Sequence, residues 1–471
     1  MKQRTRSLTK SYISFVLILM IPFFKGITQD KSSLQPYMDI VKKMRAKGMA
    51  ELKAYSMLDE LIAVAGKRMA GSPGAAAAVE QTRQWMQDLD FDDVHLEPMM
   101  VQRWVRGTVE EASVINSPTV GTRLLSVCAL GNSIGTSELG ISASVIEIQS
   151  LEEAENLGEK AKGKILFYNR PLDPDQIVTF RAYGGAVDQR GSGAIAAAKV
   201  GAVAVLVRSM TLRLDDVPHT GMMRYEDNVP KIPAAAISTR DANFLSMLLL
   251  RDPEVIVNLR LSCETRSPVP SANVVGQITG SEKPNEVILL GAHLDAWDKG
   301  VGAHDDGAGC VQVVEALRLI KELGLQPKRT IRAVLFMNEE FGQTGGSDYV
   351  KSGRRKNEKH VAAFESDAGG FIPRGFRVGR NEEVAGKYRK WLPLFQELGM
   401  DLFTAGGGGA DIGPLARQWD TLLIGVAPDS QRYFDVHHSE NDVLETVSPR
   451  ELEIGAIGMA IFAYMLAEEG N

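Results

Sequence analysis

Gly291-Ala-His-Leu-Asp-Ala-Trp-Asp-Lys-Gly-Val-Gly-Ala-His-Asp-Asp-Gly-Ala-Gly-Cys310 is the stretch that decides the fold of this chain of 471 residues. A short apolar run, residues 287–290, precedes it and is typical of a buried strand. Apolar residues then recur at helical spacing from Val311 to Leu323. The stretch therefore joins the carboxyl end of a strand to the amino end of a helix, which is the crevice where open α/β sheets bind ligands.

The groups of this stretch that can bind a metal include His293, Asp295, Asp305 and Asp306. Carboxylates packed this closely repel one another unless a cation or another partner compensates their charge. A metal site is the favoured interpretation, and a solvated polar loop is the alternative.

Acids or histidines also follow the other apolar runs of the second half of the chain. Glu339 and Glu340 follow residues 331–337, Asp367 follows residues 361–364, and His438 comes shortly after residues 422–426. Repeated strand–loop–helix segments predict an α/β fold, with a mainly parallel sheet and helices on both faces.

The middle of the chain has a different sequence pattern, in which short β-like runs alternate with glycine. We expect a β-rich unit inserted into the main domain, and one continuous sheet is the alternative. The expected division is a leader (1–28), the first part of the main domain (29–118), the insert (119–267) and the second part with the metal site (268–471).

The N-terminus has the pattern of a signal peptide, because basic residues precede an apolar run, residues 12–24, that is short for a membrane span. An uncleaved anchor is the alternative. We therefore expect an exported protein, periplasmic or extracellular, without a stable membrane anchor. Such a protein with three cysteines keeps at least one free thiol, although Cys128 and Cys263 could pair.

The charge of the chain argues against nucleic acid as a partner. The formal net charge is −6, and the leader holds five basic residues and no acids, so the mature chain is near −6 − 5 = −11. Such a surface does not favour nucleic acid or an anionic membrane.

The candidate groups match what a hydrolytic site with two metals needs, namely several N and O ligands, a bridging group and a base for water. His293, Asp367 and His438 can ligate, and Asp305 is placed to bridge. One of the adjacent Glu339 and Glu340 can ligate while the other acts as general base. Asp295 and Asp442 are the expected partners that orient the two imidazoles. The mixed ligands favour Zn²⁺, with Co²⁺ and Mn²⁺ as alternatives.

In these motifs the chain resembles the co-catalytic zinc aminopeptidase and glutamate carboxypeptidase superfamily. The motifs are His293-x-Asp295, Asp305-Asp306-Gly307, Glu339-Glu340, Asp367 and His438-Ser439. Residues 103–107, 218–221, 230–233 and 406–411 extend the resemblance over nearly the whole mature chain. The insert resembles a protease-associated domain, with Gly163-Lys164-Ile165 and Gly201-Ala202-Val203 as its marks.

The resemblance implies a role for each residue and two zinc ions per chain. His293 and Asp367 would hold one zinc, Glu340 and His438 the other, and Asp305 would bridge them. Glu339 would be the general base that activates a water molecule between the metals. The resemblance also implies a cis peptide bond between Asp305 and Asp306, and a homodimer.

One position departs from the family pattern. Many members have tyrosine before the last histidine ligand, where it stabilises the oxyanion, and here that position is His437. His437 could donate in its place, or the donor could be Tyr433. We also expect Tyr433 to contact the substrate, together with Gly408 and Asp411 of the glycine-rich loop 406–411, because glycine lets backbone approach a ligand.

The predicted function is an exported dizinc exopeptidase that acts on dipeptides or short peptides with free termini. Three alternatives stay open: an aminopeptidase on longer peptides, a single-zinc acyltransferase of the glutaminyl cyclase type, and a receptor-like protein without catalysis. The last alternative predicts broken ligands, and none of the five is broken.

Overall fold

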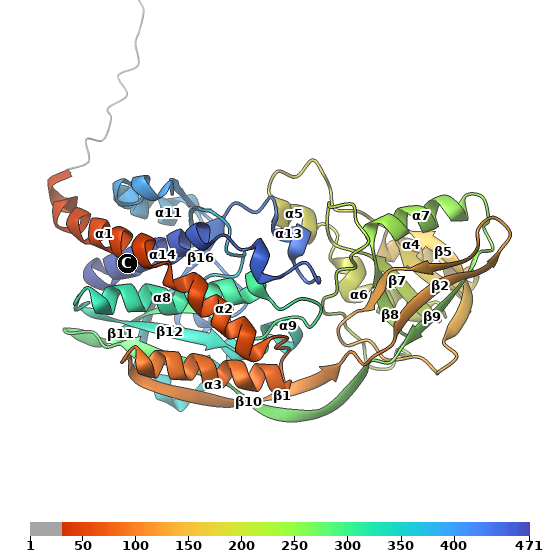
Figure 1. Ribbon diagram of the computed structural model, residues 1–471, viewed down its shortest axis with the longest axis horizontal. Helices are drawn as coiled ribbons and strands as arrows, with labels where there is room; N and C mark the ends of the chain where they lie inside the picture. The colour runs from red at the N-terminus through yellow and green to blue at the C-terminus, as the bar shows by residue number, and fades with distance from the viewer. Residues whose placement is uncertain (1–30) are drawn as a thin grey trace, which may run out of the picture.

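The computed structural model describes residues 31–471, so the expected leader lies outside the described residues. Two eight-stranded sheets organise this part of the chain and lie beside each other along its long axis (Figure 1). Between Lys31 and Asn471, no helix has the length and apolar character needed to cross a membrane.

The first sheet carries the strands that the 291–310 stretch predicts. Its order is β1 (Asp92–Val105), β10 (Glu264–Ile278), β12 (Arg329–Phe336), β11 (Lys283–His293), β13 (Lys359–Glu365), β16 (Leu422–Pro428), β14 (Pro373–Val378) and β15 (Leu402–Thr404). The central strands β12, β11, β13 and β16 are parallel, whereas β10 and β14 pair antiparallel with them. The sheet is therefore parallel at its centre and mixed towards its edges.

Helices cover both faces of this sheet, as predicted. One face packs against α1 (Lys31–Glu51), α2 (Lys53–Ala65), α3 (Pro73–Asp88), α8 (Ala308–Glu322), α11 (Glu382–Tyr388) and α14 (Pro449–Glu469). The other face packs against α10 (Gly345–Lys351) and α12 (Gly413–Trp419). The helices α1 and α2 are separate, because Leu52 between them takes a left-handed conformation with φ 49°.

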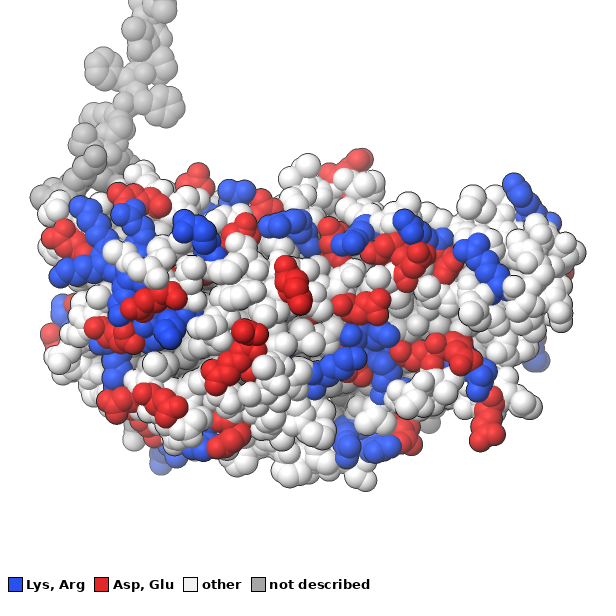
Figure 2. All heavy atoms as spheres, in the orientation of Figure 1, with Lys and Arg blue, Asp and Glu red and all other residues white. Residues whose placement is uncertain are grey.

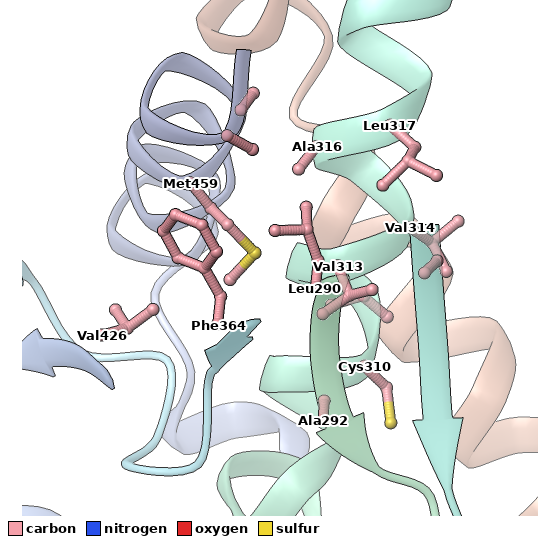
Figure 3. Close-up of a cluster of buried hydrophobic side chains, with 14 of the residues drawn as sticks. Leu290, Ala292, Cys310, Val313, Val314, Ala316, Leu317, Phe364, Val426 and Met459 are labelled. Atoms are coloured by element: carbon pink, nitrogen blue, oxygen red, sulfur yellow. The ribbon is translucent and has the colours of Figure 1, made fainter. Parts of the chain in front are cut away.

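The centre of the sheet is buried because its strands are apolar on both sides. In β11, Leu290 and Ala292 face the core beneath α8, whereas Leu289 faces the opposite core. Figure 3 shows Val313 and Leu317 of α8 beside this strand. This packing holds the loop after β11 and the start of α8 in a fixed relation.

The second sheet belongs to the middle of the chain. Its strands are, in sheet order, β3 (Gly121–Leu125), β2 (Glu110–Ser117), β9 (Ile256–Leu261), β5 (Ile141–Ile148), β6 (Ile165–Tyr168), β7 (Ala204–Arg208), β8 (Ala234–Ile237) and β4 (Val127–Ala129). Its helices are α4 (Leu151–Leu157), α5 (Thr179–Gly184), α6 (Asp188–Lys199) and α7 (Thr239–Leu249). We call residues 110–261 the inserted unit. It begins before the expected boundary at residue 119, because β2 pairs with β9 and β3.

The cysteines of the described chain are buried free thiols. Cys128 and Cys263, which the sequence allowed to pair, therefore do not form a disulfide. On the face shown in Figure 2, basic and acidic side chains are interspersed over both units.

A buried pair of carboxyl groups joins α14 to α8 away from the strand ends. Glu453 lies against Glu315, accepts a hydrogen bond from the Ala54 backbone N–H at 3.1 Å, and is fully buried. Arg318 donates to Glu315 at 2.6 Å. Burial, followed by the charge of Glu315, raises the pKa of Glu453 to about 8. Glu453 is therefore protonated in the fold at neutral pH.

We expect Glu453→Gln to flatten the pH dependence of stability. Because the pKa is raised in the fold, the neutral carboxyl stabilises most below pH 4.5, and its contribution is lost as pH rises to about 8. The slope is at most about 1.4 kcal/mol per pH unit. The free energy of unfolding, determined by thermal unfolding at several pH values between 4.5 and 9, gives this slope. Glu469→Gln, on the exposed end of α14, is the control. An unchanged slope in Glu453→Gln would contradict the assignment.

Candidate metal centre

The carboxyl ends of the central strands bring the predicted ligands together. His293 is the last residue of β11, and Asp367 follows β13 by two residues. Glu340 lies in the short helix α9 (Glu339–Gly342), just after β12. Asp305 precedes α8, and His438 follows α13 (Tyr433–Val436). Parallel neighbouring strands end at the same edge, so these side chains meet.

Asp305 is the centre of the cluster. Its Oδ1 lies 3.3 Å from Nε2 of His293, and its Oδ2 lies 3.2 Å from Nε2 of His438. Asp367 Oδ1 is 3.5 Å from the same nitrogen of His293, and Glu340 Oε2 is 3.1 Å from that of His438. One carboxylate thus separates two pairs of groups that can bind a metal.

The donor set of this cluster fits cations. Asp305, Glu340, His293 and His438 are buried, and Asp367 is partly exposed. Asp305 Oδ2 and Glu340 Oε1 are buried acceptors without a hydrogen-bond donor. Such oxygens are unfavourable in a protein interior unless a cation compensates them. Carboxylate and imidazole together are ligands typical of zinc.

The pKa values of the cluster are shifted because its ionisable groups are buried close to one another. Burial alone would lower the pKa of His293, but contacts with Asp305 and Asp367 outweigh it and raise the pKa well above its ordinary value. Burial raises the pKa of Glu339 well above its ordinary value, and nearby Glu340 adds to the increase.

The peptide bond between Asp305 and Asp306 is cis, as the family resemblance implied. Asp306 lies close to His293 and Asp367, but its carboxylate is engaged by backbone groups. Its oxygens accept hydrogen bonds from the backbone N–H groups of His293 at 3.1 Å and Gly309 at 3.0 Å. Asp306 therefore ties the end of β11 to the start of α8.

Asp295 and Asp442 make contacts that differ from the prediction. Asp295 Oδ1 accepts hydrogen bonds from the backbone N–H groups of Asn338 at 2.7 Å and Glu339 at 3.1 Å. The Nδ1 of His293 instead contacts the backbone oxygen of Asp295, at 3.0 Å. Asp442 accepts from the backbone N–H groups of residues 304 and 305, at 2.7 and 3.1 Å. The two carboxylates hold ligand-bearing loops rather than imidazoles, because the loop amides lie within their reach.

We expect Asp295→Ala to lower activity about 10- to 100-fold, the range typical of residues that support a metal site from behind. The change leaves the backbone N–H groups of Asn338 and Glu339 without their acceptor, so Glu339, the predicted base, is displaced. Steady-state kinetics together with metal analysis check this outcome. Unchanged kcat would show that the loop does not need this carboxylate.

Arg68 is a residue of the site that the sequence analysis missed. It is fully buried and donates to the backbone oxygens of Leu294 at 2.8 Å, Gly302 at 2.7 Å and Val301. It thereby fixes both ends of the loop between β11 and Asp305. A basic residue in the break between two amphipathic helices was the available signal, but such residues are usually solvated.

Glu339 and His437 line one large cavity beside the cluster. Glu339 starts α9, after Asn338 in a left-handed conformation with φ 70°, and Gln343 donates to its Oε1 at 3.1 Å. His437 is buried, its ring stacks on His438 with centroids 3.5 Å apart, and its Nε2 lies 3.6 Å from Asp305 Oδ2. Both predicted catalytic residues therefore lie next to the ligands.

The expected substrate contacts lie in different places. Tyr433 is buried and lines the large cavity. Gly408 lines a smaller cavity of about 220 Å³ on the side of Asp367. Asp411 is buried beside Glu365, which accepts its backbone N–H at 3.0 Å, and it lines neither cavity. Its expected contact with substrate is not supported, because the end of the loop turns towards Glu365.

The large cavity measures about 600 Å³ and lies between the two units. The ligand cluster forms one wall, and α5, α6 and the loop that follows β7 of the inserted unit form the other. The residues of that second wall are Phe180, Tyr183, Val187, Asp188, Arg190, Gly191, Ser192, Met222 and Arg224. The inserted unit therefore encloses the space in front of the cluster.

The known proteins with similar sequences are peptidases. The model of Peptidase family M28 matches residues 273–463. Carboxypeptidase Q of Bos taurus is 34% identical over 450 residues, which cover 95% of this chain and 93% of that protein. Carboxypeptidase Q of Homo sapiens is 34% identical over 445 residues, covering 94% of this chain and 92% of that protein.

Solved structures agree with this result. The crystal structure of a peptidase M28 precursor from Shewanella amazonensis has a TM-score of 0.86 at 35% identity, covering 92% of this chain and 97% of that chain. A zinc aminopeptidase from Bacillus subtilis shares the fold at 20% identity, with a TM-score of 0.62 and coverage of 87% of this chain and 93% of that chain. The chain therefore belongs to peptidase family M28, and it is a metallopeptidase similar to carboxypeptidase Q.

Proposed function

We propose that this protein is a dizinc exopeptidase that hydrolyses dipeptides or short peptides with free termini. The observation that carries the proposal is the position of Asp305. Its two oxygens face two different imidazoles, at 3.3 and 3.2 Å, and each imidazole has a second carboxylate beside it. His293 and Asp367 would hold one zinc, and Glu340 and His438 the other, with Asp305 shared.

Zinc bound at these residues would supply a Lewis acid that polarises the peptide carbonyl and makes water more acidic. Glu339 would accept the proton of the attacking water and then deliver it to the leaving amine. Burial raises the pKa of Glu339, which favours a carboxyl that both accepts and returns a proton.

His437 is our proposed donor to the oxyanion. It occupies the wall between the ligand His438 and the ring of Tyr183, whose centroid is 5.3 Å away. Burial lowers the pKa of His437 well below its ordinary value, and the charge of His438 adds to this effect. A neutral imidazole can still donate one N–H. Tyr433 stays the alternative donor, because it lines the same cavity.

The shape of the site supports short substrates. The inserted unit closes the large cavity opposite the ligands, so a long polypeptide would have to pass between the two units. We propose that this unit is a protease-associated domain, on the strength of its two glycine motifs. Export through the N-terminal leader, and a homodimer, stay predictions that rest on the sequence.

Metal removal tests the proposed function. We expect cleavage of unblocked dipeptides to be lost after chelation and to return with Zn²⁺, and metal analysis to find two zinc ions per chain. N-acetylated dipeptides serve as the matched control and should not be cleaved. One zinc with cyclisation of N-terminal glutamine would favour the cyclase alternative, and no turnover in the metal-loaded protein would favour the receptor-like one.

A further inference from the structure

The side chain of Gln343 contacts the predicted base. Its Nε2 donates a hydrogen bond to Oε1 of Glu339 at 3.1 Å. Between residues 31 and 471, no other side chain and no backbone N–H donates to the carboxyl group of Glu339. The base is therefore held at one of its two oxygens by one neutral donor.

The backbone of Gln343 takes a conformation that favours glycine. Its φ is 52° and its ψ is 39°, in the left-handed region, and its N–H donates to the backbone oxygen of Glu339 at 3.2 Å at the end of α9. A glutamine is strained there, because its Cβ crowds the carbonyl oxygen that follows. Residues held in such conformations cluster at functional sites. The fold would accept glycine more easily, so the glutamine side chain needs another explanation.

The side chain of Gln343 does not belong to the hydrophobic core. It is exposed, and it lines the large cavity together with Glu339, Glu340 and His438. Its removal leaves no buried void, and exposed substitutions of this kind change stability little. An effect of Gln343 on the reaction can therefore be separated from an effect on folding.

The backbone around α9 is held by other residues. Asn338 Nδ2 donates to Oγ1 of Thr344 at 2.9 Å, across the two ends of α9. Asn273 of β10 clamps the same segment, because it accepts from the N–H of Met337 at 2.9 Å and donates to the backbone oxygen of Gly345 at 3.0 Å. These bonds do not use the glutamine amide. Loss of that amide therefore frees the side chain of the base and leaves the backbone that carries it in place.

We infer that Gln343 is a positioning residue, whose amide holds the carboxyl group of Glu339 in the orientation that proton transfer needs. This inference rests on the proposed function. With Oε1 held, Oε2 takes one proton of the attacking water, whose oxygen bonds to the carbonyl carbon. When the C–N bond breaks, the same proton passes from Oε2 to the leaving nitrogen. A carboxyl group fixed in this way is preorganised, whereas an unrestrained glutamate also populates other rotamers.

Gln343→Asn tests this role. Asparagine keeps the amide and tolerates the left-handed conformation, but it is one methylene too short to reach Oε1 of Glu339. We expect kcat on dialanine to fall about tenfold, the size of one lost hydrogen bond to a charged group. KM should change by less than about threefold, because the step affected is proton transfer. Zinc content and Tm should stay at the wild-type values.

Gln343→Gly is the second variant. It also lacks the contact with Glu339 and relieves the strain of the backbone, so it should show the same loss of kcat without a loss of stability. It serves if the asparagine variant does not fold. Wild-type kcat in Gln343→Gly would contradict the role of the amide.

Gln84→Asn is the matched control. Gln84 is an exposed glutamine of α3 that donates to Oδ1 of Asp88, four residues away, at 2.7 Å, and it lines neither cavity. This variant loses the same kind of glutamine–carboxylate contact and should keep kcat within about twofold of the wild-type value. An equal loss in Gln84→Asn and Gln343→Asn would overturn the inference, because the effect would not depend on the base.

A double-mutant cycle shows whether Gln343 acts through Glu339. In a chain that already carries Glu339→Gln there is no base to orient. Adding Gln343→Asn should therefore lower the residual kcat by less than about twofold. A further tenfold loss in this background would mean a merely structural role and would overturn the inference.

Substrate contact is the competing assignment for Gln343, because the residue lines the large cavity. A raised KM with unchanged kcat in Gln343→Asn would assign it to substrate binding and overturn the inference. If the wild-type enzyme with zinc cleaves no unblocked dipeptide, the proposed function itself falls. Wild-type cleavage that Gln343→Asn leaves unchanged overturns only the role of Gln343.

Discussion

Glu339→Gln is expected to lower kcat by about 10³-fold, within the range of general acid–base catalysis. Glutamine keeps the size of the side chain and its contact with Gln343, but its amide cannot accept the proton of the attacking water. The position of the side chain should not change, because Asp295 holds the backbone N–H of residue 339 at 3.1 Å. The loss therefore reports on proton transfer alone.

The measurement is kcat on an unblocked dipeptide, together with the zinc content of the same preparation. Zinc should be unchanged, since Glu339 is not one of the proposed ligands. Glu440→Gln is the matched control, because Glu440 is exposed and lies two residues beyond His438. If Glu339→Gln kept activity near the wild-type value, another group would have to be the base.

Asp305→Asn is expected to remove activity and at least one of the two zinc ions. The carboxylate is the group that both imidazoles face, and the amide lacks its charge and one of its two acceptor oxygens. The buried cations would then lose the anion between them, which is costly in a protein interior. The loss of activity should exceed the ~100-fold that follows changes to residues around metal ligands.

Metal analysis and kinetics on the same sample separate the two effects. Asp420→Asn is the control, because Asp420 is exposed at the end of α12 in a left-handed conformation that asparagine also adopts. Full zinc content and wild-type activity in Asp305→Asn would contradict the shared position of this carboxylate.

The sequence alone was enough to predict the ligand cluster. The predicted ligands follow runs of apolar residues, and short runs of this kind between glycine and polar residues are typical of buried strands. Neighbouring parallel strands then place their carboxyl ends at one edge. The predicted strands at residues 287–290, 331–337, 361–364 and 422–426 are confirmed as β11, β12, β13 and β16. The positions of His293 and Asp367 followed from that rule.

The sequence was less informative where a residue's role depends on a partner far along the chain. Asp295 and Asp442 were correctly placed near the ligands, but their hydrogen bonds go to loop amides. The conformation of a loop, which decides which amides are free, depends on packing and not on local pattern. The start of the inserted unit at β2 likewise depends on pairing with β9, whose residues lie far away in the chain.

Local periodicity and the residues at strand ends therefore determined the α/β fold, the family resemblance and the set of ligands. Only the tertiary structure decided which groups surround them. Arg68 and Arg190 reach the site from segments that are remote in sequence, and a single basic residue carries no pattern that distinguishes it from a solvated one. The cavity exists only because the inserted unit packs against the strand ends, and that contact is made by burial of distant side chains on folding.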